Sequence, residues 1–114
     1  MPRSPTRKAP AVDPERLRLG AEQAVATLKL LGHEARLLLL CQIAQRECSV
    51  GELEALLDIR QPTLSQQLGI LRRAGAVQTR RDGKNIHYRL ADPALIQLVR
   101  LLDQLYCPEE EPTA

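Results

Sequence analysis

The stretch from Gln61 to Gly75 limits the fold most strongly, because it has the marks of a helix with two very different faces. Leu64, Leu68 and Leu71 recur at helical spacing and form one apolar stripe. A proline at its second position suits the first turn of a helix, and the final glycine is placed to end it in a left-handed conformation. The remaining face is polar and basic, and we expect the following side chains on it: Gln61, Thr63, Ser65, Gln66, Gln67, Arg72 and Arg73.

A second helix is predicted immediately before this one. Ser49 has the position of an N-cap, and Glu52 stands at capping-box spacing from it. Leu53, Leu56 and Leu57 are expected to form the buried face of this helix. A tight turn over residues 58–60 then leads into the longer helix. Two short helices joined in this way, the second with a polar outer face, predict a helix-turn-helix.

A two-stranded hairpin is expected over residues 76–90. Asp82-Gly83 is a strong turn signal, and the alternating Ile86, Tyr88 and Leu90 predict one apolar face. Three basic residues crowd its tip: Arg80, Arg81 and Lys84. A basic hairpin on its own is typical of a soluble sheet edge. Directly after a basic helix, it predicts the wing of a winged helix-turn-helix.

The charge distribution favours a nucleic-acid face on these two elements. The whole chain carries a formal charge of only +2, yet residues 60–89 contain seven basic residues and a single carboxylate, Asp82. Amides and hydroxyls read base edges in the major groove of double-stranded DNA, and arginines hold phosphates. We therefore expect Gln61, Thr63, Ser65 and Gln66 to make base or groove contacts. Backbone or minor-groove contacts are expected from Arg72, Arg73, Arg80, Arg81 and Lys84.

Three further helices complete an α+β, mainly α, domain over residues 13–107. Asp-Pro pairs at Asp13 and Asp92 start helices that run to about Leu31 and Cys107, and His33 to Gln45 forms a central apolar helix. The first and last helices carry more apolar surface than so small a domain needs, which favours a homodimer through both. Residues 1–12 are expected to be a disordered basic tail and residues 108–114 an acidic one.

Composition excludes several classes of protein. The longest apolar run, Leu37 to Cys41, is too short to cross a membrane, and the N-terminus lacks the apolar stretch of an export signal. A cytoplasmic protein is the expectation. Three cysteines do not make a disulfide framework. The sequence has no glycine-rich phosphate loop and no Cys–His arrangement at plausible spacing, so neither an enzyme nor a bound cofactor is expected.

The segments LKLLGHEARLLLL, SVGELEALLDIRQPTLSQQLGILRRAGAV and RRDGKNIHYRLADP resemble those of ArsR-type winged-helix repressors. The resemblance implies a homodimer joined through its terminal helices, which binds operator DNA and releases it when an inducer acts. The best-known metal motif of the family is Cys-Val-Cys, where this chain has Ser49-Val50-Gly51, and residues 92–107 contain no histidine for the second metal site. No metal site is therefore expected.

Cys41 and Cys107 are similar to the paired thiols of one branch of the family, that of the BigR and SqrR repressors. That resemblance implies sensing of sulfide and persulfides through a di- or polysulfide crosslink between the two cysteines. It implies control of genes for sulfide oxidation and detoxification. Apolar neighbours should raise the pKa of Cys41, and Cys107 lies at a helix C-terminus that opposes a thiolate. Cys48 is expected in a more exposed turn.

Other functions stay open at this point. A metal- or metalloid-responsive repressor could use Cys41, Cys48 and Cys107 as a thiolate trio. A DNA-binding protein without any inducer would have ordinary core cysteines, as a cysteine in an apolar helix usually is.

Overall fold

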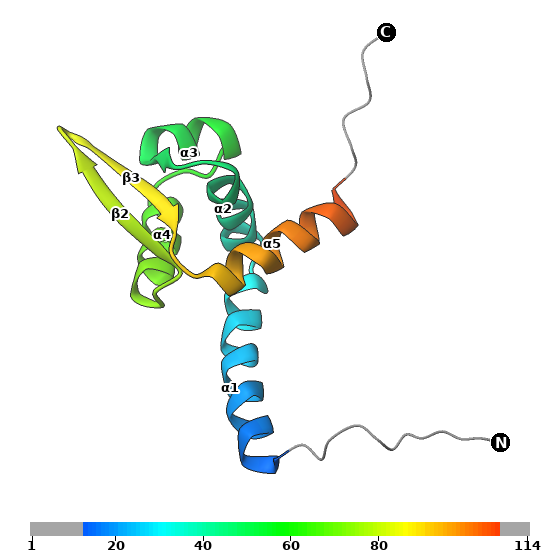
Figure 1. The fold of residues 1–114 in the computed structure, drawn as a ribbon. Helices are drawn as coiled ribbons and strands as arrows, with labels where there is room; N and C mark the ends of the chain where they lie inside the picture. Colours follow the sequence, from blue (N-terminus) through cyan, green and yellow to red (C-terminus); the bar gives the residue numbers. More distant parts are fainter. Residues whose placement is uncertain (1–12, 108–114) are drawn as a thin grey trace, which may run out of the picture.

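The computed structural model describes residues 13–107, and the two predicted tails, 1–12 and 108–114, lie outside the described residues. The helices and strands follow in the expected order, with one short strand added (Figure 1). Their bounds are α1 Pro14–Leu31, α2 Glu34–Gln45, β1 Cys48–Ser49, α3 Val50–Leu57, α4 Thr63–Arg73, β2 Val77–Asp82, β3 Asn85–Leu90 and α5 Pro93–Tyr106. The predicted mainly α winged helix-turn-helix is confirmed.

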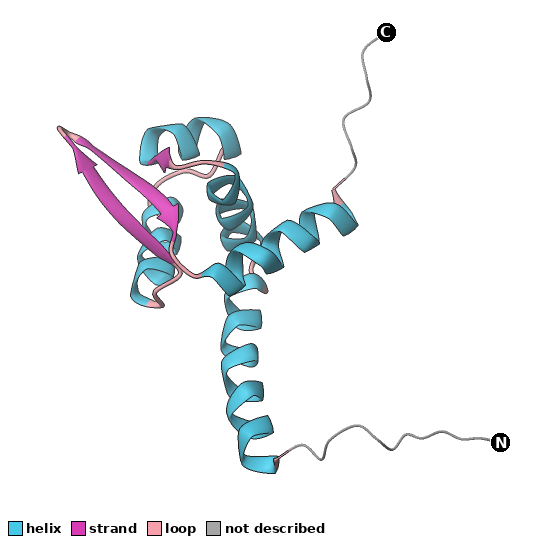
Figure 2. Ribbon diagram, in the orientation of Figure 1, coloured by secondary structure: helices cyan, strands magenta, loops and turns pink. Residues whose placement is uncertain are grey.

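The sheet has three antiparallel strands in the order β1-β3-β2, where the sequence predicts a hairpin of two (Figure 2). The additional strand β1 pairs Cys48 with Tyr88 and Ser49 with His87. A strand of two residues is too short to show the alternation by which strands are predicted. Its pairing joins the middle of β3 to the start of α3, so the wing is connected to the helical body beyond its own two ends.

The hairpin turn lies one residue later than the Asp82-Gly83 signal suggests. Asp82 pairs with Asn85, so Gly83 and Lys84 form the two-residue loop. Gly83 has φ +64°, a conformation that favours glycine in this kind of turn. Lys84 therefore lies at the very tip of the wing.

The core is centred on α2, as predicted. Leu39, Leu40 and Ile43 are buried, and α2 packs against α1, α3, α4 and α5 (Figure 1). The apolar stripe of α4 meets it from one side: Leu64, Leu68 and Leu71 are all buried. Leu95 and Val99 of α5 close the core from the other side. The position of α4 is thus fixed by aliphatic packing on α2, and its other face is left to solvent.

Local signals place most of the helix ends. Asp13 and Asp92 accept hydrogen bonds from the backbone N–H groups of Glu15 and Ala94. Ser49 and Glu52 form the predicted capping box at 3.1 and 2.8 Å. Gly75 follows α4 with φ +78°, as expected. The start of α4 is later than predicted, at Thr63.

Leu56 and Cys48 differ in burial from what the sequence predicts. Leu56, predicted in the core with Leu53 and Leu57, is exposed, because an eight-residue helix turns only part of its surface to α2. Cys48, predicted in a more exposed turn, is fully buried, because β1 pairs it with Tyr88 of β3. No helix within residues 13–107 is long and apolar enough to span a bilayer.

Candidate nucleic-acid interface and thiol pair

The outer face of α4 is polar and exposed at both ends, and the half-buried Gly69 and Ile70 lie between them. Thr63, Ser65 and Gln66 lie at its N-terminal end, and Arg72 and Arg73 at its C-terminal end. The helix contains no acidic residue. Such a surface offers hydroxyl and amide groups at one end of the helix and two full positive charges at the other. It has the composition that major-groove contact requires.

Gln61 has a local role that explains the late start of α4. Its Oε1 accepts hydrogen bonds from the backbone N–H of Ser65 at 3.2 Å and from the Ser65 hydroxyl at 2.5 Å. The side chain thus satisfies one of the free N–H groups at the helix start. Its carbonyl oxygen is occupied, so only its NH₂ group is left to meet a base or a phosphate.

Gln67 does not lie on this exposed face, which corrects the sequence-based placement. Its side chain is only 9% exposed, and its Oε1 accepts a hydrogen bond from Arg36 Nη1 at 3.0 Å. The signal for burial was present, since Gln67 falls three residues after Leu64 and four before Leu71. Its polarity suggested an exposed side chain instead, and its half-buried partner, Arg36, lies 31 residues away in the chain.

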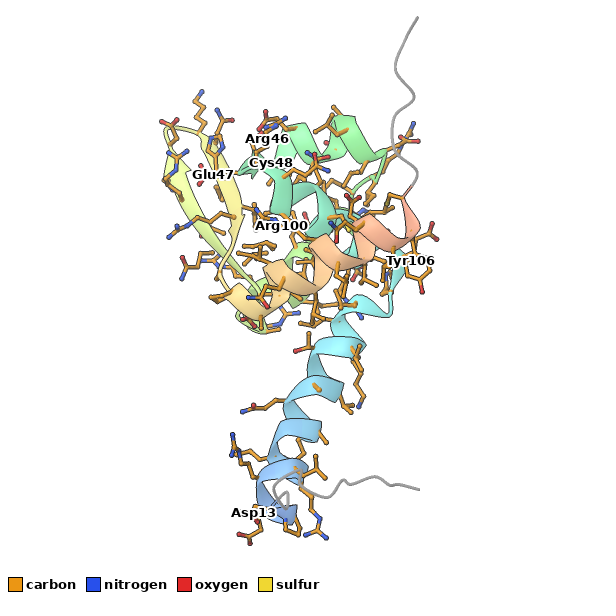
Figure 3. All side chains as sticks on the ribbon, turned by 45° about the vertical axis from the view of Figure 1, so that its right-hand side comes forward. Asp13, Arg46, Glu47, Cys48, Arg100 and Tyr106 are labelled. Carbon is orange, nitrogen blue, oxygen red and sulfur yellow. The ribbon has the colours of Figure 1, made fainter. Side chains whose placement is uncertain are left out.

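The basic residues of the wing differ in whether a carboxylate neutralises them. Arg80 donates to Glu47 Oε1 from Nε at 3.0 Å and from Nη2 at 2.5 Å, and this pairing lowers the pKa of the Glu47 carboxyl. Glu47 lies beside the wing (Figure 3). Arg81 and Lys84 are exposed, and none of the ion pairs within residues 13–107 includes either of them. Glu47 could not be predicted from the sequence, because the loop before Ser49 gives no sign that it lies beside the wing.

The two predicted sensor thiols belong to two helices that pack against each other, α2 and α5. Cys41 is half-buried on α2, and Cys107 follows α5 and is exposed. A pocket of about 240 Å³ opens between these helices, lined by Cys41, Ala44, Gln45, Val99, Arg100 and Asp103. Cys107 is one helical turn beyond Asp103. Asp103 therefore lies near both thiols.

The surroundings of both thiols favour the protonated form, because the pKa of each is raised. Burial is the largest cause of the raised pKa of Cys41, with smaller electrostatic contributions from Cys107 and Asp103. A hydrogen bond to Asp103 is the main cause of the raised pKa of Cys107. The expected effect of apolar surroundings on Cys41 is confirmed. Asp103 was missed, although its spacing of four residues from Cys107 on one helix could have revealed it.

Comparison with known proteins identifies the family. The model described as bacterial regulatory protein, arsR family, matches residues 33–79. The Biofilm growth-associated repressor of Agrobacterium fabrum is 57% identical over 91 residues, which cover 80% of this chain and 78% of that protein. The chain belongs to the arsR family. It is a transcriptional repressor with a helix-turn-helix that binds DNA, and not an enzyme.

Solved structures of relatives support the fold of this ArsR-family repressor. The crystal structure of the repressor BigR from Xylella fastidiosa is similar with a TM-score of 0.78 and 45% identity, over 86% of this chain and 100% of that one. Reduced HlyU from Vibrio cholerae gives a TM-score of 0.79 at 37% identity, over 82% and 99%. HlyU carries the name of a transcriptional activator.

The three cysteines of this ArsR-family repressor are not gathered at one place. Cys48 is enclosed in the core, where its Sγ donates to the Arg46 carbonyl oxygen at 3.4 Å and accepts from Gln42 Nε2 at 3.9 Å. Within residues 13–107, no three His, Cys, Asp or Glu side chains lie close enough to share a metal ion. A thiolate trio for a soft ion would therefore need a different arrangement of this chain.

Proposed function

We propose that this ArsR-family repressor binds its operator as a homodimer and is released by persulfides through Cys41 and Cys107. The observation that carries the proposal is that Asp103 is shared by both thiols: it lines a pocket with Cys41 between α2 and α5, and it contributes to the raised pKa of Cys107. Relatives named as repressors support regulation by repression. The sulfide-responsive branch to which these two cysteines are similar suggests the inducer.

The DNA-contacting surface is assigned to the exposed face of α4 and to the wing tip. Thr63, Gln66 and the NH₂ group of Gln61 are placed to meet base edges, with Ser65 beside them. Arg72, Arg73, Arg81 and Lys84 are assigned to phosphates, because they are exposed and outside the ion pairs of residues 13–107. Gln67 is removed from the predicted set because it is buried, and Arg80 contributes less because Glu47 balances its charge.

A homodimer through α1 and α5 explains the apolar side chains that this chain leaves in solvent. Leu17, Leu28 and Leu105 are among its most exposed large apolar residues, and all three lie on these two helices. The stripe expected on α1 is buried only at Leu31. Burial of such residues against a second copy is favourable by about 1.5–3 kcal/mol for each leucine. A two-fold dimer would bring two copies of α4 to successive major grooves, roughly 34 Å apart.

The proposed crosslinking needs no oxidant other than the persulfide. A low-molecular-weight persulfide, RSSH, transfers its outer sulfur to one thiolate and leaves as the thiol RSH. Cys107 is reached first because it is exposed. The Cys41 thiolate then attacks the Cys107 sulfur, expels hydrosulfide and forms a disulfide. The two thiols lose two electrons, and the transferred sulfur is reduced to sulfide. When both cysteines carry a persulfide, the same displacement leaves a trisulfide.

A longer bridge has a geometric advantage. A disulfide requires its two Cα atoms to lie within about 7 Å, and each inserted sulfur extends that reach. If the Cα atoms of Cys41 and Cys107 lie beyond that limit, a polysulfide bridge forms with less strain than a disulfide does. Closing it would shift α5 against α2 and alter the apolar surface that α5 presents to the second subunit. The spacing of the two α4 helices would change, and the operator would be released.

The test is fluorescence anisotropy with DNA from upstream of the protein's own gene, at fixed salt. Reduced, peroxide-treated and glutathione-persulfide-treated protein are compared for the wild type and for Cys107→Ser. Cys48→Ser is the matched control, because serine keeps a donor for the Arg46 carbonyl oxygen. We expect persulfide to weaken DNA binding more than tenfold in the wild type and in Cys48→Ser, and to have no effect on Cys107→Ser.

Two results would contradict the proposal. A clean Cys41–Cys107 disulfide and full release with peroxide alone would remove the selectivity for persulfide. Unchanged DNA binding under every treatment would show that the cysteines are ordinary packing residues. A titration with arsenite, in competition with a thiol-alkylating reagent, would then test the metalloid alternative.

A further inference from the structure

Arg36, at the start of α2, joins three helices through one side chain. Its Nε donates to the Leu30 carbonyl oxygen at 2.9 Å, and its Nη2 donates to the Lys29 carbonyl oxygen at 2.8 Å. Both carbonyls belong to the last turn of α1, where backbone acceptors have few partners within the helix. The positive charge also lies favourably at the negative end of the α1 dipole. Arg36 thus completes the C-terminus of α1.

The third bond of Arg36 reaches α4. Its Nη1 donates to Gln67 Oε1 at 3.0 Å, and Gln67 is the single buried polar residue within residues 13–107. None of the ion pairs in that range includes Arg36, so its charge is balanced by neutral oxygens alone. Breaking one of these bonds would leave a partly buried donor unsatisfied, which is costly. The arrangement therefore resists a change in the position of α4 relative to α1.

We propose that Arg36 and Gln67 are positioning residues, which hold α4 at the angle that operator binding requires and couple that angle to α1. Gln67 contributes to DNA recognition without touching DNA. The inference rests on the proposed role of α4 in reading the operator, and it is independent of the thiol chemistry. It adds a physical connection between the helix assigned to the subunit interface and the helix assigned to the groove.

The chemistry of arginine explains why this position needs that residue. Its planar guanidinium presents several N–H donors in fixed directions, so it can bond three oxygens on two helices at once. A lysine keeps the charge but is a single point donor on a flexible stem. Arg36→Lys should therefore keep the charge at the end of α1 and remove the bond to Gln67.

The experiment measures binding to operator DNA and to a scrambled duplex for four variants. They are Arg36→Lys, Gln67→Leu, Gln67→Glu and the double variant Arg36→Lys/Gln67→Leu. Arg46→Lys is the matched control, because Arg46 follows the same helix α2 but bonds Glu52 of α3. Thermal unfolding of each variant separates loss of folding from loss of positioning.

We expect Arg36→Lys and Gln67→Leu each to weaken operator binding about tenfold, the effect of losing roughly 1.4 kcal/mol. Binding to the scrambled duplex should change little. The double variant should bind no more weakly than either single one, because both remove the same bond. Gln67→Glu should retain operator affinity, since a carboxylate still accepts from Arg36.

Gln67→Glu provides the sharpest distinction. If Gln67 contacted DNA directly, a carboxylate there would repel phosphate and would abolish binding, which would overturn the inference. Additive effects in the double variant would also overturn it, as would effects that merely follow the unfolding temperature. Gln66→Ala tests the underlying assignment. If it binds the operator normally, α4 is not the reading helix; if it weakens binding while Gln67→Leu does not, the positioning role alone fails.

Discussion

Asp103 is the carboxylate that contributes to the raised pKa of both thiols. Its carboxylate raises the pKa of Cys107 by a hydrogen bond and adds to the raised pKa of Cys41. Asp103→Asn removes that negative charge, so both pKa values should fall and more thiolate should be present at neutral pH. Because the thiolate is the reactive form, we expect iodoacetamide to alkylate Cys107 several-fold faster, at about pH 7.5.

Mass spectrometry of the alkylated peptides gives the rate at each cysteine separately. Glu54→Gln is a suitable control, since it removes an exposed carboxylate on α3 and should leave both rates unchanged. Alkylation of Cys48 should stay slow throughout, because that thiol is buried. Equal rates for Asp103→Asn and the wild type would show that Asp103 has no influence on the thiols.

At the scale of elements, the wing should bind DNA unequally through its two adjacent arginines. Arg81→Ala should lower the slope of log affinity against log salt by about 0.9 for each phosphate that is no longer neutralised. Arg80→Ala should lower it less, because Glu47 already neutralises that guanidinium. Glu47→Gln should have the opposite effect, a steeper salt dependence and tighter binding, because it frees Arg80. Anisotropy titrations at several salt concentrations measure all three.

The prediction about the wing has a clear contrary result. Equal weakening of DNA binding by Arg80→Ala and Arg81→Ala, with no gain in affinity for Glu47→Gln, would mean that the Glu47–Arg80 ion pair opens on DNA.

The elements themselves were largely predictable, because α4 and the hairpin carry local signals such as the leucine stripe and the glycine turn. β1 was not predictable, because its two residues become a strand only when β3 lies beside them.

At the scale of the whole molecule, the exposed apolar surfaces of α1 and α5 should be covered by a second copy. Leu28→Glu places a charge in that surface and should weaken the dimer roughly ten- to a hundredfold. Leu56→Glu on α3 is the matched control, because the two leucines are similarly exposed, at 58% and 52%, and only the first lies on α1 or α5. Size-exclusion chromatography with light scattering measures the molecular mass of each variant across a range of concentrations.

Two outcomes distinguish the possibilities for the assembly. A monomeric Leu28→Glu with a dimeric Leu56→Glu and wild type is the expected result, and its operator affinity should fall with dissociation. A wild-type protein that remains monomeric at micromolar concentration would contradict the proposed homodimer. The interpretation of two α4 helices in successive grooves would then fail as well.

The helices, the hairpin, the basic face of α4 and the family could be predicted from the sequence, because each depends on residues close together in the chain. The contacts between distant side chains became known only from the packed fold. It buried Gln67 on Arg36, paired Arg80 with Glu47, enclosed Cys48 and brought Asp103 near both Cys41 and Cys107. Periodicity reports the face on which a residue lies, but hydrogen bonds and charge pairs depend on distances between elements, and these exist only after the helices have packed.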